Sequence, residues 1–229
     1  MPPREGAADD ILSRYLTPAD VVLRHTATTF VTNPNVSRGV PNVTPMTLLD
    51  TPTLPTSTAA ERAERLTAAG SAWGERIAAD TTAAHLTYTV HGSGQGAVGT
   101  ALRAGKHEFF IDEPGALAGD DVAASPVEFA LGALVACQVV VYRLYAQALG
   151  IQVDDVDVTA EGDLDARRLF GIDESVRAGF GAVRLNISIA GPESEERYQQ
   201  LRDAVDAHCP VLDLFSNETP VITTVSKRA

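Results

Sequence analysis

The chain has 229 residues, of which 45% are hydrophobic and 21% charged, and this composition suits one or two globular domains with a sizeable core. Its net charge of -12 at pH 7 disfavours densely anionic partners, so we expect neither nucleic acid nor a membrane surface as a partner. Two cysteines are too few for a disulfide-stapled secreted domain, and no signal-like apolar stretch follows the N-terminus. We therefore expect a cytoplasmic protein.

Residues 1–82 are predicted to be an N-terminal extension of the main domain. A short helix is predicted at 9–15. Residues 31–58 follow as a proline- and threonine-rich segment, which predicts an extended chain that wraps against a surface. Residues 58–80 then repeat apolar or small side chains at three- and four-residue steps, a spacing that predicts a helix.

Residues 83–229 are predicted to form the main domain, because apolar and polar side chains alternate regularly from this point. The first part is expected to be a three-stranded antiparallel meander whose turns are rich in glycine. Its strands are predicted at 85–92, 97–105 and 106–114, with turns at 92–96 and 104–106.

A long apolar helix is predicted between Pro126 and Gly150. The Ser125 hydroxyl can cap its first turn, Pro126 fits the first helical position, and Gly150 suits its end. Apolar side chains surround nearly the whole helix, which predicts a central position in a folded domain. Gln138 and Arg143 interrupt the apolar run, so a buried helix is favoured over a membrane span.

The rest of the domain is predicted to hold two strands, an amphipathic helix, a short helical turn and a closing strand. The resulting order, β-β-β-α-β-β-α-β, defines an α+β fold. These elements are expected at 153–165, 181–191, 194–208, 210–217 and 220–225.

Both cysteines occupy positions that suit thiol chemistry. Cys137 lies in the middle of the apolar helix, and Cys209 lies before a proline at the end of the amphipathic helix. A thiolate that attacks a peroxide becomes a sulfenic acid, and a second thiol condenses with it to a disulfide. Free cysteine is also among the most buried residue types, so an inert place in the core is an equal alternative.

The order of elements and the two cysteine positions resemble the OsmC/Ohr family of bacterial thiol peroxidases over residues 83–226. The resembling motifs surround both cysteines and the later strands. They are Ser125-Pro126-Val127-Glu128, Ala133-Leu134-Val135-Ala136-Cys137, Tyr142-Arg143-Leu144-Tyr145-Ala146, Gly150-Ile151, Glu161-Gly162-Asp163-Leu164-Asp165, Gly179-Phe180, Cys209-Pro210-Val211 and Thr219-Pro220-Val221.

The resemblance implies an OsmC-like fold in an intertwined homodimer, with two long central helices between sheets. It implies that Cys137 is peroxidatic and reduces a small hydrophobic hydroperoxide, while Cys209 resolves the sulfenic acid to a disulfide. A dithiol reductant, such as a lipoylated protein, would then restore both thiols in defence against oxidative stress. We expect no cofactor and no metal ion at this site.

Two positions depart from the family pattern, and both concern activation of the thiol. The peroxidases supply an arginine from the glycine-rich turn of the first hairpin, but residues 92–96 contain none. They also carry a carboxylate directly after the proline, where this chain has Val127, and Glu128 fits better as a helix N-terminal acid. Two alternatives therefore stay open: a small-molecule binding module, or a metabolic enzyme that reuses the pocket at the dimer interface. His208, beside Cys209, is a further candidate base.

Overall fold

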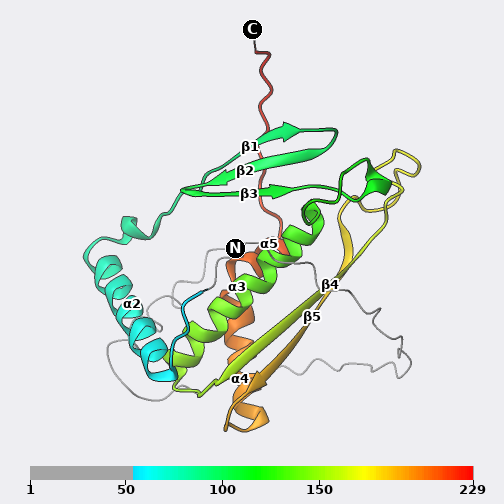
Figure 1. Cartoon of the computed structure of the whole chain (residues 1–229). Coiled ribbons are helices and arrows are strands. Elements are labelled where there is room, and N and C mark those ends of the chain that lie inside the picture. Colours follow the sequence, from blue (N-terminus) through cyan, green and yellow to red (C-terminus); the bar gives the residue numbers. More distant parts are fainter. Residues whose placement is uncertain (1–53, 229) are drawn as a thin grey trace, which may run out of the picture.

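The computed structural model describes residues 54–228 and has two small antiparallel sheets beside one long helix (Figure 1). The helix predicted at 9–15 and most of the proline-rich segment lie outside these residues. Helix α2 (Ala59–Ala79) confirms the helix predicted at 58–80, and a short turn of 3-10 helix, η1 (Thr81–Ala84), follows it. The first turn of α2 is a capping box, in which Thr58 and Glu61 bond each other's backbone N–H groups.

The first sheet is the predicted meander, with β1 (Val90–Gln95), β2 (Gly99–Ala104) and β3 (His107–Ile111) in that order. The turn between β2 and β3 holds Gly105 at a φ of 60°, a left-handed conformation that favours glycine. The first strand begins later than predicted, at Val90. Ala104, the last residue of β2, pairs with Val90, so residues 85–89 have no partner on this strand.

The first turn of the meander lies later in the chain than predicted. Gly92 and Gly94 lie inside β1, where they pair with Leu102 and Thr100, and the turn begins only at Gly96. A glycine-rich run suits a turn, but here the register with β2 decides, since a Cβ on Gly92 would press against the Leu102 side chain.

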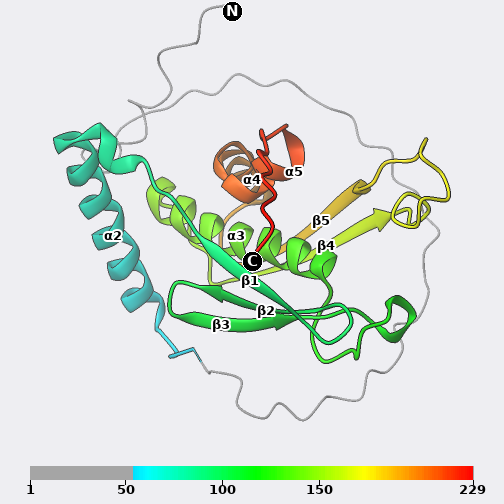
Figure 2. The same cartoon turned by 90° about the horizontal axis from the view of Figure 1, so that it is seen from above.

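Helix α3 (Pro126–Leu149) has its predicted boundaries and runs through the middle of the domain (Figures 1 and 2). Ser125 and Glu128 form a capping box, which confirms that the Glu128 carboxylate serves the helix N-terminus. Gly150 ends the helix at a φ of 61°. By length and composition α3 could also cross a membrane, and only 22% of its most apolar 18-residue window is buried within this single chain. Within the described chain, α3 is therefore covered by other elements on one side only.

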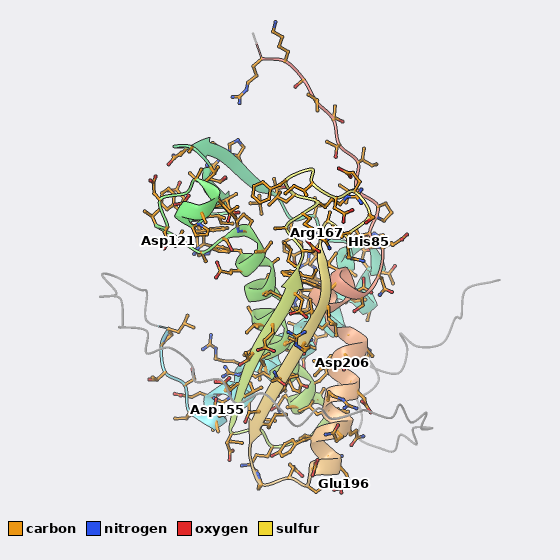
Figure 3. All side chains as sticks on the ribbon, turned by 90° about the vertical axis from the view of Figure 1, so that its right-hand side faces the viewer. His85, Asp121, Asp155, Arg167, Glu196 and Asp206 are labelled. Atoms are coloured by element: carbon orange, nitrogen blue, oxygen red, sulfur yellow. The ribbon has the colours of Figure 1, made fainter. Side chains whose placement is uncertain are left out.

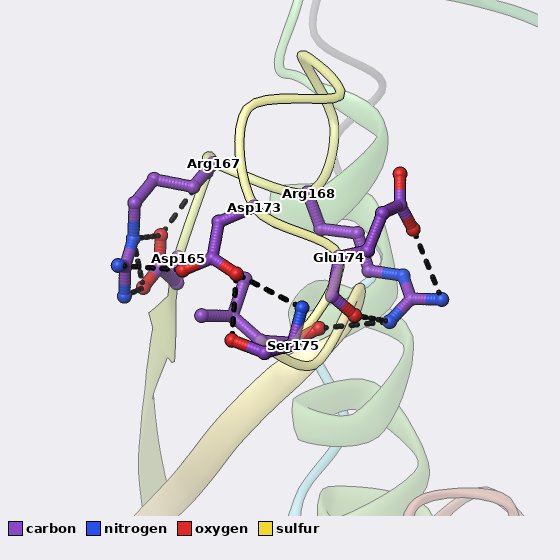
Figure 4. Close-up of polar contacts among 7 residues, drawn as sticks. Asp165, Arg167, Arg168, Asp173, Glu174 and Ser175 are labelled. Atoms are coloured by element: carbon purple, nitrogen blue, oxygen red, sulfur yellow. Dashed lines mark hydrogen bonds and ion pairs between the residues drawn. The ribbon is translucent and has the colours of Figure 1, made fainter.

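The second sheet pairs β4 (Asp155–Leu164) with β5 (Phe180–Ala190), close to the strands predicted there. The long connection between them is ordered by ion pairs (Figure 4). Arg167 contacts Asp165 and Asp173, while Arg168 contacts Glu174. These bonds connect residues of a polar loop that holds no helix or strand.

Helices α4 (Glu195–His208) and α5 (Pro210–Ser216) complete the described elements and pack against α3. The closing strand predicted at 220–225 is not formed within the chain. Val221, Ile222 and Val225 are 84%, 93% and 91% exposed, and the tail leads away from the domain (Figure 1). An alternating apolar pattern makes a strand only where another strand pairs with it. The buried core consists of Val141, Tyr142, Ala146, Ile151, Val156, Leu201, Val205 and Cys209.

The loop that leads from β3 to α3 is built around one buried carboxylate, Asp112. It accepts hydrogen bonds from the N–H groups of Asp120 and Val122, at 2.9 and 3.2 Å, and closes the loop over the short 3-10 turn η2 (Gly115–Leu117). Bonds from backbone N–H groups, that of Glu113 foremost, hold the pKa of Asp112 below its usual value. The same closure brings Gly119 so near Glu113 that a Cβ would overlap the Glu113 carbonyl.

We expect Gly119→Ala to lower the free energy of unfolding by about 1–3 kcal/mol, because overpacking forces the backbone of this loop to move. The matched control is Gly115→Ala, where the added Cβ meets nothing within 4 Å. Urea unfolding of both variants measures the difference. Equal unfolding curves for the two alanine variants would show that the loop tolerates the extra atom.

Candidate thiol site

Cys137 and Cys209 come together where α3, α4 and α5 meet, although they stand at positions 137 and 209 of the sequence. Both are free thiols. The Cys137 side chain packs against the core that contains Cys209, and the Cys209 thiol and the Val211 backbone N–H are near enough to influence its pKa. The structure therefore brings together the two residues that the sequence analysis proposed as a pair. Whether they are catalytic is a separate question of chemistry.

The Cys-Pro step explains how the second thiol reaches α3. Proline lacks an N–H and disfavours helical backbone in the residue before it, so α4 ends and α5 begins at this step. Cys209 is extended, at a φ of -80° and a ψ of 110°, and it caps both helices. It is 2% exposed and belongs to the core, whereas Cys137 is only partly buried and packs against that core.

The surroundings of Cys137 favour its protonated form. Burial is the main effect and raises the pKa of the Cys137 thiol, and the adjacent Cys209 thiol raises it further. The Val211 N–H acts in the opposite direction, because a donor pointing at sulfur stabilises the thiolate. In residues 54–228 of one chain, no positively charged side chain is among the groups that shift this pKa. The described part of the chain thus provides no cation that would favour ionisation of the Cys137 thiol.

Three arginines that could act as this cation lie elsewhere in the fold. Arg103 stands on β2 opposite Glu108. Arg184, on β5, forms an ion pair with Asp163 on β4. Arg143 lies six residues beyond Cys137 and lines a cavity between α2 and α3. The sequence analysis found no arginine at the family's usual position, and the described fold supplies none from these three positions.

His208 is held away from a role as base to the adjacent thiol. Its Nδ1 lies 2.7 Å from the carbonyl oxygen of Ala204, which fixes the proton on Nδ1 when the ring is neutral. Its ring stacks on Tyr145 of α3, with centroids 4.7 Å apart. Among the described contacts of His208, both anchor the end of α4 to α3, so a packing role accounts for this residue.

A functional candidate that sequence reasoning missed is Gln138, beside Cys137. Its side chain is fully buried, and neither Nε2 nor Oε1 has a hydrogen-bond partner among the described residues. A buried amide without partners costs free energy, and it marks a place where water or a ligand completes the bonding. In the sequence, Gln138 is an amide side chain within an apolar stretch of helix, a feature that we interpreted only as evidence against a membrane span.

A groove of about 1090 Å³ runs between β5 and the helices α4 and α5. Its lining is mixed: Leu134, Leu212 and Phe215 are apolar, whereas Arg202 and Asp203 are charged, and Leu212 also packs on the core that holds Cys209. Asp206 of α4, labelled in Figure 3, lies at its rim, and burial raises the pKa of this carboxyl group. The groove is large enough for a small apolar molecule near the thiol pair.

The described domain is an α+β fold in which two free thiols lie close together beside the long helix. Residues 119–224 match the family model described as OsmC-like protein. This match confirms the resemblance of the cysteine motifs to the OsmC-like family. No curated protein sequence matches the chain.

Several solved structures are similar to this chain, and the fold is compared with the first of them. An OsmC-like protein from Mycoplasma pneumoniae is 18% identical with a TM-score of 0.51, and the match covers 57% of this chain and 88% of that one. An organic hydroperoxide resistance protein OsmC from Legionella pneumophila is 21% identical, with a TM-score of 0.46 over 58% and 90% of the two chains. The organic hydroperoxide resistance protein OhrB of Bacillus subtilis is 21% identical, with a TM-score of 0.42 over 56% and 90%. The OsmC-like fold is thus confirmed; the domain boundary at residue 83 stays a prediction.

Proposed function

We propose that the chain reduces organic hydroperoxides through a two-cysteine cycle, with Cys137 as the peroxidatic and Cys209 as the resolving residue. The proximity of the two thiols carries this proposal, because a sulfenic acid at one sulfur can then meet the other without unfolding. The match of residues 119–224 to the OsmC-like family model supports it. Two free thiols suit a reducing compartment, which we take to be the cytoplasm.

The cycle balances with three reactants. The Cys137 thiolate attacks the hydroperoxide O–O bond, which yields a sulfenic acid on Cys137 and an alcohol. The Cys209 thiol then displaces hydroxide from the sulfenic acid, so one water leaves and a disulfide forms. A dithiol, such as the dihydrolipoyl group of a lipoylated protein, reduces this disulfide and is itself oxidised to a cyclic disulfide.

Attack requires a thiolate, and the raised pKa of Cys137 makes this the demanding step. The Val211 N–H stabilises the thiolate within the chain. We infer that a second chain completes the site. The α3 side that faces away from the core leaves Gly132, Ala133, Ala136 and Val140 exposed, and such small side chains let another helix approach closely. A homodimer packed on this face would shield the helix and bring further side chains toward Cys137.

The test is consumption of cumene hydroperoxide by the full chain with dihydrolipoamide as reductant. Cys137→Ser should abolish turnover, while Cys209→Ser, assayed without the dithiol, should consume one equivalent of peroxide and retain a sulfenic acid on Cys137. Below the Cys137 pKa the thiolate is the minor form. The wild-type rate should therefore rise about tenfold for each unit by which the pH is raised toward that pKa. Folding of each variant is checked by circular dichroism. Full activity in Cys137→Ser would eliminate the proposal.

A second candidate follows from the same raised pKa: a non-peroxidase, either a small-molecule binding module or a metabolic enzyme that reuses this pocket. A protonated Cys137 and a groove of about 1090 Å³ with both apolar and charged lining suit retention of a small molecule better than attack on peroxide. Native mass spectrometry of the purified chain distinguishes the candidates. A bound small molecule together with no peroxide loss above that of Cys137→Ser, at any pH, favours the second candidate.

A further inference from the structure

A cavity of about 350 Å³ lies between α2 and the last turns of α3, and neither cysteine lines it. Its α2 wall comes from the first turns of that helix, and its other wall from the end of α3 and the segment that leads into β4. Helix α2 is fixed there by the Gln147 amide, which donates to the Thr67 hydroxyl at 3.0 Å. The cavity therefore exists only because the N-terminal helix docks on α3.

Two arginines from different elements line this cavity. Arg143 of α3 is partly buried, and within residues 54–228 it has no hydrogen bond and no ion pair. Arg62 of α2 is also partly buried, and its guanidinium reaches only the carbonyl oxygen of Asp154, at 3.4 Å. Two arginines that line one cavity without carboxylate partners among the described residues are unusual in a chain of net charge -12, since partly buried charges are normally paired.

The remaining lining defines the kind of molecule that fits. Leu66, Ile151 and Val153 provide an apolar surface beside the two guanidinium groups. Asp154 is the acidic residue in the lining, and its carboxylate accepts a hydrogen bond from the Gln152 amide at 2.9 Å. Two positive side chains and one negative side chain leave a surplus of one positive charge. A ligand with a single negative charge and a short apolar body matches both the charge and the lining.

We propose that α2 and the end of α3 form a binding site for a small amphipathic carboxylate, separate from the thiol pair. The carboxylate lies between Arg62 and Arg143, where planar guanidinium groups can each donate two hydrogen bonds. The apolar body lies along Leu66 and Ile151. Binding ties the N-terminal helix to α3 and raises the melting temperature of the chain.

Calorimetric titration of the full chain with octanoate tests this site, with octanol as the neutral probe of equal length. Octanoate should bind at least about tenfold more tightly than octanol, because a charge-assisted hydrogen bond is lost in the alcohol. Arg143→Gln should weaken octanoate binding at least about tenfold and leave octanol binding unchanged. Arg103→Gln, on β2 and outside this cavity, is the matched control and should bind like the wild type.

Two further measurements keep the result unambiguous. Ala63→Phe fills the cavity without changing its charge and should abolish binding of both probes. Cys137→Ser should bind octanoate like the wild type, so failure of the peroxidase proposal leaves this one intact. Equal affinity for octanoate and octanol, or wild-type octanoate binding by Arg143→Gln, would overturn the site. Tighter binding of octyl phosphate than of octanoate would overturn the preference for a carboxylate.

Discussion

Oxidation of the full chain by one equivalent of hydroperoxide should join Cys137 to Cys209 and raise the free energy of unfolding by about 2–4 kcal/mol. The two side chains are already neighbours in the reduced fold, so we expect the bond to form with little movement of the backbone. The bond closes the loop between positions 137 and 209, a long loop whose closure restricts the unfolded chain strongly. It also ties α5 to α3, two helices that already pack against each other.

Urea unfolding with and without dithiothreitol measures this difference, and non-reducing mass spectrometry shows the loss of two hydrogens. Cys209→Ser is the control, because it keeps Cys137 available for oxidation but removes the partner sulfur. Its unfolding curve should not shift upward on oxidation. An oxidised wild-type chain that stays unlinked, or that links only between chains, would contradict the proposed pairing and with it the resolving role of Cys209.

Val140→Glu should convert the protein from a dimer to a monomer. Val140 is 55% exposed in the single chain although it stands in the middle of the most apolar helix, and the exposed Ala136 lies one turn before it. If two α3 helices pack on this face, the new carboxylate is buried without a partner. An unpaired buried charge costs about 3–5 kcal/mol, which weakens association by a factor of at least about 100.

Analytical ultracentrifugation over a range of concentrations measures the change in association. Leu54→Glu is the matched control, because this leucine is 89% exposed and lies before α2, away from the face of α3. Circular dichroism should show that both variants keep their helices. A wild-type chain that sediments as a monomer, or a Val140→Glu variant that stays a dimer, would exclude α3 as the dimer contact.

Much of the local structure is written in short stretches of sequence. The ends of α3 follow from Ser125, Pro126 and Gly150, because capping and left-handed glycine act over a single turn. The break between α4 and α5 follows from the Cys-Pro step for the same reason. Register between strands is less local, and the glycine-rich stretch of β1 shows it: Gly92 was expected in a turn and pairs with Leu102 instead.

The sequence by itself thus determined most of the elements, the resemblance to the OsmC-like family and the two candidate thiols, because periodicity, caps and motifs lie in contiguous residues. Only the tertiary structure decided that Cys137 meets Cys209, that Gln138 lacks partners, and that Arg62 and Arg143 face one cavity. These relations join residues far apart in the chain, and they depend on how helices pack. The electrostatic surroundings of Cys137 belong to the same class, since burial and neighbouring groups exist only in the folded state. The closing segment at 220–225 marks the same limit, because its apolar alternation needs a partner strand that the single chain does not provide.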